Sequence, residues 1–120
     1  MAKVEAVRLT PRLQVIADQI APGARLADIG TDHAHLPIWL IENGRVVSAI
    51  ASDIREGPLA RAEENAARHG CLGRISLRLG AGLDKVCAEE CDTVSIAGMG
   101  GETIADILTA APWTAEGKHL

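Results

Sequence analysis

The chain has 120 residues and a formal net charge of −4, which suits one ordinary domain and leaves no room for a second. Its hydrophobic fraction of 48% excludes a disordered protein, and no apolar run approaches the roughly 20 residues of a membrane-spanning helix. The acidic balance and the scarcity of aromatic residues, which are two Trp, argue against a dedicated nucleic-acid-binding module, although not against an enzyme that acts on RNA.

The cysteines and the first residues indicate a reducing compartment. Residues 1–12 contain neither an apolar core nor a small-residue cleavage site, so we expect a cytoplasmic protein. Cys71, Cys87 and Cys91 are then expected to be free thiols rather than partners in disulfides. A zinc site that includes His69 is the weaker alternative, because the sequence lacks the usual C-x-x-C pairs, and we predict no metal.

The first half of the chain predicts alternating helices and strands. Thr10 is a good N-cap and Pro11 suits a first helical turn, so we expect a helix that Pro22 and Gly23 end. The next predicted elements, in chain order, are a buried strand over 25–29, a helix over 37–43 that Gly44 closes, and a second apolar strand over 46–52.

The second half continues the alternation. Gly57 and Pro58 open a helix that runs to about His69, with an acidic beginning and a basic end that suit the helix dipole. The remaining predicted elements are a strand over 74–79, a strand over 92–97 and a helix over 102–111. Apolar residues alternate in the first of these strands, which predicts that one of its faces is less buried. The whole pattern is typical of an α/β domain with a parallel sheet.

A polar loop follows the first predicted strand. Gly30 begins this loop, and Asp53 stands at the end of the second predicted strand. In doubly wound nucleotide-binding folds, a glycine loop at the first position and a ribose-binding acid at the second form the nucleoside site. The alternative is that Gly30 only makes a tight turn and Asp53 only caps a helix. The coincidence of loop, acid and strand spacing favours the nucleoside site.

Asp32 indicates which nucleoside cofactor the loop would bind. A dinucleotide loop would carry a second glycine at this position, so that the backbone could approach a pyrophosphate. A carboxylate there repels phosphate and attracts a cation, which favours S-adenosylmethionine, with its sulfonium and ammonium groups, over NAD. The alternative is that Asp32 points away from the ligand.

Two glycine-rich turns follow the third and fourth predicted strands. The small residues at positions 80–83 would let an adenine lie close to the backbone, although an ordinary turn would also account for these residues. Residues 98–101 follow a strand expected beside the first, where ligands bind in doubly wound sheets. The alternatives there are a flexible turn and a core-filling role for Met99.

Three segments together resemble a known family. ADIGTDHAHLPIWLIENG, AIASDIREGPLARAEENAARHG and IAGMGGETIADIL are similar to the bacterial tRNA methyltransferases that methylate N1 of adenine 22, the TrmK family, and the likeness runs from about Arg8 to Leu108. The resemblance implies an α/β fold of the class I, Rossmann-like methyltransferase type, with about four parallel strands and flanking helices in one domain over 1–120. It also implies S-adenosylmethionine as cofactor and tRNA as substrate.

The resemblance also implies particular contacts. Those with the cofactor are expected at Asp28, Gly30, Thr31, Asp32, His33, Asp53, Ile54, Gly80, Ala81, Gly82, Leu83, Gly98 and Met99. Those with the target adenine are expected in the turn formed by Gly98, Met99, Gly100 and Gly101.

Methylation of N1 requires alignment more than a strong base, because the N1 lone pair is already available. A carboxylate beside the target could accept the N6 proton and stabilise the developing positive charge. Asp32 is the first candidate, and His33 and His35 are the second. The alternative for a His in such a loop is capping or packing. His35 also stands where the family often has Tyr.

Members of the family continue beyond the region that this chain resembles, with further strands and a helical domain implicated in tRNA binding. The fourth predicted strand would then be an exposed edge, which favours self-association. The alternative to a methyltransferase is a module that binds the cofactor or a partner without turnover. A small-molecule methyltransferase and an NAD-dependent enzyme are weaker alternatives.

Arg55, Arg61 and Arg68 lie along the helix predicted after Asp53 and could form a row that faces RNA. Glutamates are interspersed among them, so a solvated face with salt bridges is the favoured interpretation.

Overall fold

Four parallel strands form one sheet in the order β3-β2-β1-β4. The computed structural model describes residues 8–96, so the predicted helix over 102–111 and the predicted contacts at Gly98, Met99, Gly100 and Gly101 lie outside the described residues. The strands are β1 (Leu26–Ile29), β2 (Ala49–Asp53), β3 (Ile75–Leu79) and β4 (Thr93–Ile96). This order places the carboxyl ends of β1, β2 and β4 side by side, as in a doubly wound nucleotide-binding sheet. The predicted Rossmann-like fold class is confirmed.

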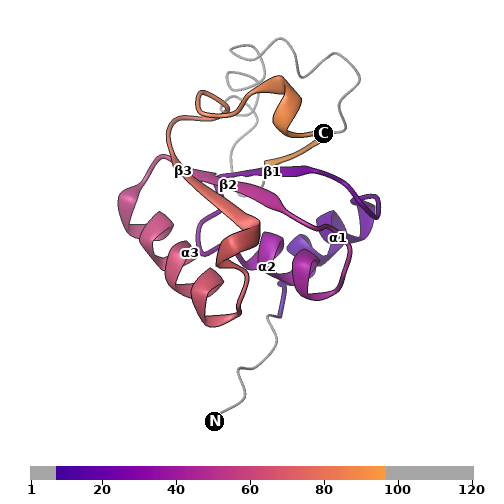
Figure 1. Cartoon of the computed structure of the whole chain (residues 1–120). Helices are drawn as coiled ribbons and strands as arrows, with labels where there is room; N and C mark the ends of the chain where they lie inside the picture. Colours follow the sequence, from indigo (N-terminus) through magenta and orange to yellow (C-terminus); the bar gives the residue numbers. More distant parts are fainter. Residues whose placement is uncertain (1–7, 97–120) are drawn as a thin grey trace.

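Three helices cover one face of the sheet, and the segment between β3 and β4 lies over the other (Figure 1). The helices are α1 (Pro11–Gln19), α2 (His35–Glu42) and α3 (Glu56–Arg68), and two short 3-10 turns are η1 (Leu72–Arg74) and η2 (Ala88–Glu90). The Thr10 hydroxyl accepts a hydrogen bond from the Leu13 amide at 3.3 Å, as expected of the predicted N-cap. No helix in the described part of the chain is long and apolar enough to cross a membrane.

Helix α2 begins two residues before its predicted start. Ala34 adopts a left-handed conformation and serves as the N-cap, which puts Pro37 at the third helical position. Proline is tolerated there because the amide groups of the first turn have no partner within the helix. Strand β2 in turn begins later than predicted, since the Val46 and Arg45 amides bond to the Leu40 carbonyl at the end of α2.

The apolar residues form two clusters, one on each face of the sheet. The larger lies between the sheet and the three helices and is built from aliphatic side chains such as Leu26, Ile38 and Leu40. The smaller includes Ile29, Leu83 and Val94 on the opposite face. Every residue of β1 and β2 is buried, whereas β3 is only partly buried. The sequence predicts that one face of the third strand is less buried than in the first two, and Ser76, which is exposed, and Arg78, which is half-buried, lie on that face.

The cysteines lie in or near the core. Cys71 and Cys91 are buried and Cys87 is exposed, and all three are free thiols. The turn between Cys87 and Cys91 is the 3-10 turn η2 rather than an α-helix. Within residues 8–96, no group of three His, Cys, Asp or Glu side chains is arranged to hold a metal ion.

Candidate functional site

The loop between β1 and α2 has an unusual backbone. Gly30, Asp32 and Ala34 all have positive φ angles, of 69°, 58° and 62°. Such a conformation costs a residue with a side chain roughly 1 to 2 kcal/mol, so surrounding contacts must maintain it. The Thr31 amide bonds to the Ser52 carbonyl at 2.9 Å, and the Ala34 amide bonds to the Thr31 carbonyl at 3.0 Å. The sharp turn therefore fixes the positions of the polar side chains at the carboxyl edge of the sheet.

Asp28 lies beneath this loop, near the end of β1, with only 3% of its surface exposed. The Thr31 hydroxyl donates to one carboxylate oxygen and the Ser95 hydroxyl to the other, each at 2.8 Å. Burial raises the pKa of Asp28 to about 6, although the two hydroxyl hydrogen bonds lower it. Asp28 thus joins the loop to β4 and titrates near neutral pH.

Asp53 is equally buried at the end of β2, but its carboxylate accepts hydrogen bonds from other kinds of donor. The Arg55 amide donates to Oδ1 at 3.0 Å and the Asp32 amide to Oδ2 at 3.1 Å. The Arg55 guanidinium also contacts Oδ1 at 3.3 Å. Burial raises the pKa of Asp53, but these bonds outweigh burial and hold the pKa below its ordinary value.

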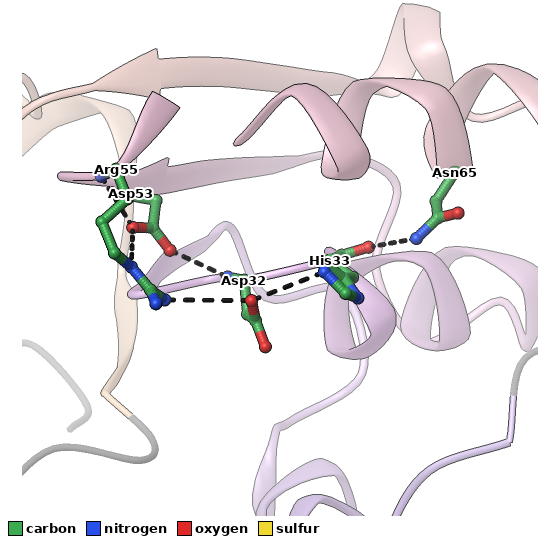
Figure 2. A network of polar contacts seen from close by, with 5 residues as sticks. All are labelled: Asp32, His33, Asp53, Arg55 and Asn65. Carbon is green, nitrogen blue, oxygen red and sulfur yellow. Dashed lines mark hydrogen bonds and ion pairs between the residues drawn. The ribbon is translucent and has the colours of Figure 1, made fainter. Parts of the chain in front are cut away.

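Asp32 connects the two strand ends (Figure 2). Its carboxylate is largely exposed and lies 3.8 Å from Nη2 of Arg55 and 3.8 Å from Nε2 of His33. The side-chain amide of Asn65, on α3, donates to the His33 carbonyl at 2.9 Å. The Asp32 side chain is therefore exposed at the site while its backbone is fixed.

The two histidines of the loop lie together. The rings of His33 and His35 are 5.7 Å apart and meet edge to face. Burial lowers the pKa of His35, and the neighbouring His33 lowers it further. His35 is thus a neutral imidazole at pH 7, which leaves one ring nitrogen able to accept a proton.

A cavity of about 300 Å³ opens beside the loop. Its walls are formed by the loop between β1 and α2, by α2 itself and by the first turn of α1. Its polar lining includes Arg12, Asp28, Asp32, His35 and Arg55. The structure thus brings five of the predicted residues, namely Asp28, Gly30, Thr31, Asp32 and His35, to one cavity.

Other predicted contact residues lie outside this cavity. Ile54 follows Asp53 and is 66% exposed, which is unusual for a large aliphatic side chain. The Gly80 amide bonds to the Asp53 carbonyl at 3.0 Å, which brings the turn of residues 80–83 beside the end of β2. Leu83 is buried in the smaller cluster, so its side chain packs in the core. Ala81 is exposed and Gly82 partly exposed.

Residues 9–120 match the protein family described as methyltransferase domain. The chain belongs to this family. The sequence is also 42% identical over 113 residues to the tRNA (adenine(22)-N(1))-methyltransferase of Bacillus subtilis strain 168. This match covers 94% of this chain and 48% of that protein.

Solved structures resemble the methyltransferase domain closely. Streptococcus pneumoniae Sp1610 in complex with S-adenosyl-L-methionine is 38% identical, with a TM-score of 0.87 over 92% of this chain and 52% of that one. M. capricolum TrmK in complex with S-adenosyl-homocysteine is 40% identical, with a TM-score of 0.81 over 86% of this chain and 47% of that one. The chain spans about half the length of the relatives it matches.

Two arginines of the methyltransferase domain were not predicted at this site. The sequence groups Arg55 with Arg61 and Arg68 on α3, but the structure places it before the helix, bound to Asp53 and Asp32. Its position two residues after a strand-end acid is the signal that could have indicated this. Arg12 reaches the cavity because α1 packs beside the loop, and no local pattern in the sequence predicts that contact. Within the described residues, no ion pair joins Arg61 or Arg68 to the glutamates of α3, so the predicted salt-bridged face is wrong in that detail.

Proposed function

We propose that this chain forms one S-adenosylmethionine-binding domain of an enzyme that methylates N1 of adenine 22 in tRNA. The observation that carries the proposal is the pair of buried carboxylates at neighbouring strand ends, with Asp32 between them in place of a pyrophosphate-binding glycine. The 42% identity to a tRNA (adenine(22)-N(1))-methyltransferase supports the proposed reaction and substrate. A tRNA substrate would in turn favour a cytoplasmic location.

Asp53 is the proposed ribose-binding residue. Its lowered pKa keeps it ionised at neutral pH, and its two backbone donors fix the carboxylate. One lone pair then remains on each oxygen for a ribose hydroxyl group, and the Arg55 guanidinium occupies the one on Oδ1 in this structure. The exposed side chain of Ile54 would offer an apolar surface to the adenine beside this ribose. The small residues Gly80, Ala81 and Gly82 are proposed to border the adenine on its other side.

The remaining acids suit the charged part of the cofactor. S-adenosylmethionine carries a sulfonium and an ammonium group, and both Asp28 and Asp32 line the adjoining cavity. A carboxylate in the loop and a second one at the adjoining strand end would repel a pyrophosphate, which makes NAD a poor fit to these residues. Gly30, Thr31 and His33 are proposed to contact the cofactor through the sharply turned loop backbone.

When bound, S-adenosylmethionine would supply an activated methyl group that needs no protein nucleophile. The task of the chain is then to align N1 of the adenine with that methyl group and to compensate the positive charge that develops on the ring. Asp32 is proposed for this role because its carboxylate is exposed beside the cavity. His35, neutral and lining the same cavity, is the second candidate to accept the N6 proton, and His33 is the third.

We also propose that copies of the chain associate through β4, which is an outer strand of the described sheet. Sedimentation velocity at increasing concentration would then show a growing dimer fraction, and Ile96→Lys on this strand would reduce it. A clean monomer at high concentration would contradict this part of the proposal.

Isothermal titration of the 120-residue chain with S-adenosylmethionine, with NAD as control, tests whether the chain binds the proposed cofactor selectively. Selective binding of S-adenosylmethionine is the expected result, and absence of binding by a chain shown to be folded by circular dichroism would overturn the proposal. Transfer of a labelled methyl group to a tRNA transcript, compared with a transcript that carries guanine at position 22, then tests the reaction. Binding without transfer would support the alternative of a cofactor-binding module without turnover.

A further inference from the structure

A second cavity opens at the edge of the sheet opposite the glycine loop. It has a volume of about 370 Å³ and lies where β1, β2 and β3 begin, next to η1 and η2. Strands of four or five residues, at about 3.3 Å for each residue, put roughly 15 Å between the two edges. This amino-edge cavity is therefore separate from the site that Asp28, Asp32 and Asp53 form.

The amino-edge cavity is basic, although the whole chain has a net charge of −4. Within residues 8–96, its charged lining consists of Arg25, Arg74, Arg78 and Glu90. Arg25 directly precedes β1 and Arg74 directly precedes β3, so the order of the strands in the sheet brings their side chains to one cavity. No run of basic residues in the sequence marks this cluster.

One of the three arginines is neutralised by the acid of the cavity. The guanidinium of Arg78 donates to the two carboxylate oxygens of Glu90, at 2.7 and 2.5 Å. These bonds lower the pKa of Glu90 to about 2, so Glu90 remains an anion at neutral pH. The charges of Arg78 and Glu90 thus cancel, and the net charge of the cavity comes from the other two arginines.

Those two arginines differ in what they already contact. Arg25 donates to the Glu89 carbonyl at 2.7 Å and lies 3.7 Å from the carboxylate of Asp92. Arg74 is exposed, and it makes no ion pair or side-chain hydrogen bond in the described part of the chain. Its five N–H donors are available to an anion, and Arg25 adds a second, partly engaged cation.

A phosphate group suits these donors. A guanidinium has a planar fork of N–H groups that matches the oxygens of phosphate and of carboxylate. Phosphate is the better match here, because its tetrahedral oxygens can face two guanidiniums that approach from different strands. The exposed Ser48 at the same cavity offers a further hydroxyl donor. A volume of about 370 Å³ also leaves room for the sugar that a phosphate ester carries.

We propose that the amino-edge cavity binds a phosphate group, with Arg74 as the principal cation and Arg25 beside it. One source of such a group is the backbone of an RNA substrate, which is large enough to contact both edges of the sheet; for this source the inference rests on the proposed function. The other source is a free phosphate compound. In both cases the ligand binds away from the residues proposed for the cofactor.

Two probes separate the sources. Fluorescence anisotropy of a labelled tRNA transcript over a series of NaCl concentrations tests the RNA backbone, and isothermal titration with inorganic pyrophosphate tests a free phosphate compound. The variants are Arg74→Gln and Arg74→Lys. The matched control is Arg61→Gln on α3, since Arg61 is also exposed and forms no ion pair within the described residues.

For the RNA, Arg74→Gln should reduce the slope of log Kd against log salt concentration by about 0.9, the value for one phosphate contact. If both proteins bind equally at about 1 M salt, this slope corresponds to roughly fivefold weaker binding at about 0.15 M. The loss should be the same on a transcript with guanine at position 22, because backbone phosphates carry no base sequence. Arg74→Lys should keep the slope because it keeps the charge, and Arg61→Gln should behave as wild type.

A change for RNA assigns the cavity to the RNA backbone, and a change for pyrophosphate alone assigns it to a free phosphate compound. Unchanged binding of both probes would overturn the proposal, as would an equal change in Arg61→Gln. S-adenosylmethionine should bind Arg74→Gln as it binds wild type, and weaker binding would show a general effect on the fold and also contradict a separate site. If the wild-type chain fails to bind S-adenosylmethionine, the proposed function is overturned, while the pyrophosphate titration still decides on this cavity.

Discussion

The ends of β1 and β2 present two carboxylates that are equally buried but differ in their acidity. Asp28 and Asp53 are each 3% exposed and belong to strands that pair directly. Asp28 has a pKa raised to about 6, whereas the pKa of Asp53 is lowered. Burial opposes ionisation at both positions, but Asp28 lies deep in the protein and Asp53 lies nearer its surface, so burial raises the pKa of Asp28 more strongly.

The donors add to this difference in depth. Asp28 receives two neutral hydroxyl groups, from Thr31 and Ser95. Asp53 receives two backbone amides and a guanidinium, which stabilise its negative charge more strongly. One strand end therefore keeps a permanent anion suited to ribose hydroxyls, and the other holds a group that changes charge close to neutral pH.

The largest effect is expected from Asp32→Asn, at the residue that connects the two strand ends. Its backbone amide would continue to hold Asp53, but the exposed carboxylate would be lost. We expect methyl transfer to tRNA to fall more than roughly 100-fold, in line with the removal of one group that stabilises transition-state charge. Single-turnover transfer at saturating S-adenosylmethionine measures this, and retained activity would remove Asp32 from the proposed catalytic residues.

Asp53→Asn should weaken binding of S-adenosylmethionine by about 100-fold, because two hydrogen bonds to a charged group would be lost. Asp18→Asn, on the exposed face of α1, is the matched control. Isothermal titration gives both dissociation constants, and circular dichroism verifies the fold. Equal affinities of the Asp53 variant and wild type would show that the end of β2 does not bind the ribose.

Asp28 should make stability depend on pH. Because its folded-state pKa of about 6 lies above the ordinary value of 3.8, the folded state binds the proton more tightly than the unfolded state does. Its contribution is fully present below about pH 4 and is lost as pH rises toward 6, by on the order of 3 kcal/mol. Urea unfolding of wild type and Asp28→Asn at several pH values measures the difference. Parallel pH profiles of the two proteins would contradict the raised pKa.

Arg55→Ala should have the smallest effect and the opposite sign. The exposed guanidinium competes with ribose for Oδ1 of Asp53, so its removal should tighten binding of S-adenosylmethionine by about two- to fivefold, the scale of an exposed ion pair. The pKa of Asp53 should also rise, which moves the acid limb of the binding profile to higher pH. Arg61→Ala is the control. Weaker binding by the Arg55 variant would indicate that Arg55 itself holds the cofactor.

Much of the described fold could be predicted from the sequence. The four strands and three helices within residues 8–96 appear in the predicted order, because apolar periodicity and turn residues are local signals. The start of α2 was misplaced because Pro37 looks like a first helical residue, whereas the left-handed Ala34 begins the helix earlier. The start of β2 was misplaced because Val46 is apolar but bonds to the end of α2.

The candidate site was predicted in outline. Gly30, Asp32 and Asp53 follow from strand ends and loop chemistry, which a sequence displays directly. The positions of Arg12 and Arg55 at the site could not be found in this way. Arg12 depends on how α1 packs beside the loop, and Arg55 depends on the direction in which the chain leaves β2.

By itself the sequence determined the α/β alternation, the loop that carries Asp32 and the acid at the end of the second strand, since each depends on neighbouring residues. Only the tertiary structure decided which donors meet each acid. Ser95 reaches Asp28 from 67 positions away because β4 pairs with β1, and the Asp32 amide reaches Asp53 because the loop turns through left-handed conformations. Charge and hydrogen bonding act through space, so the acidity of each carboxylate was fixed by strand pairing and loop shape rather than by its neighbours along the chain.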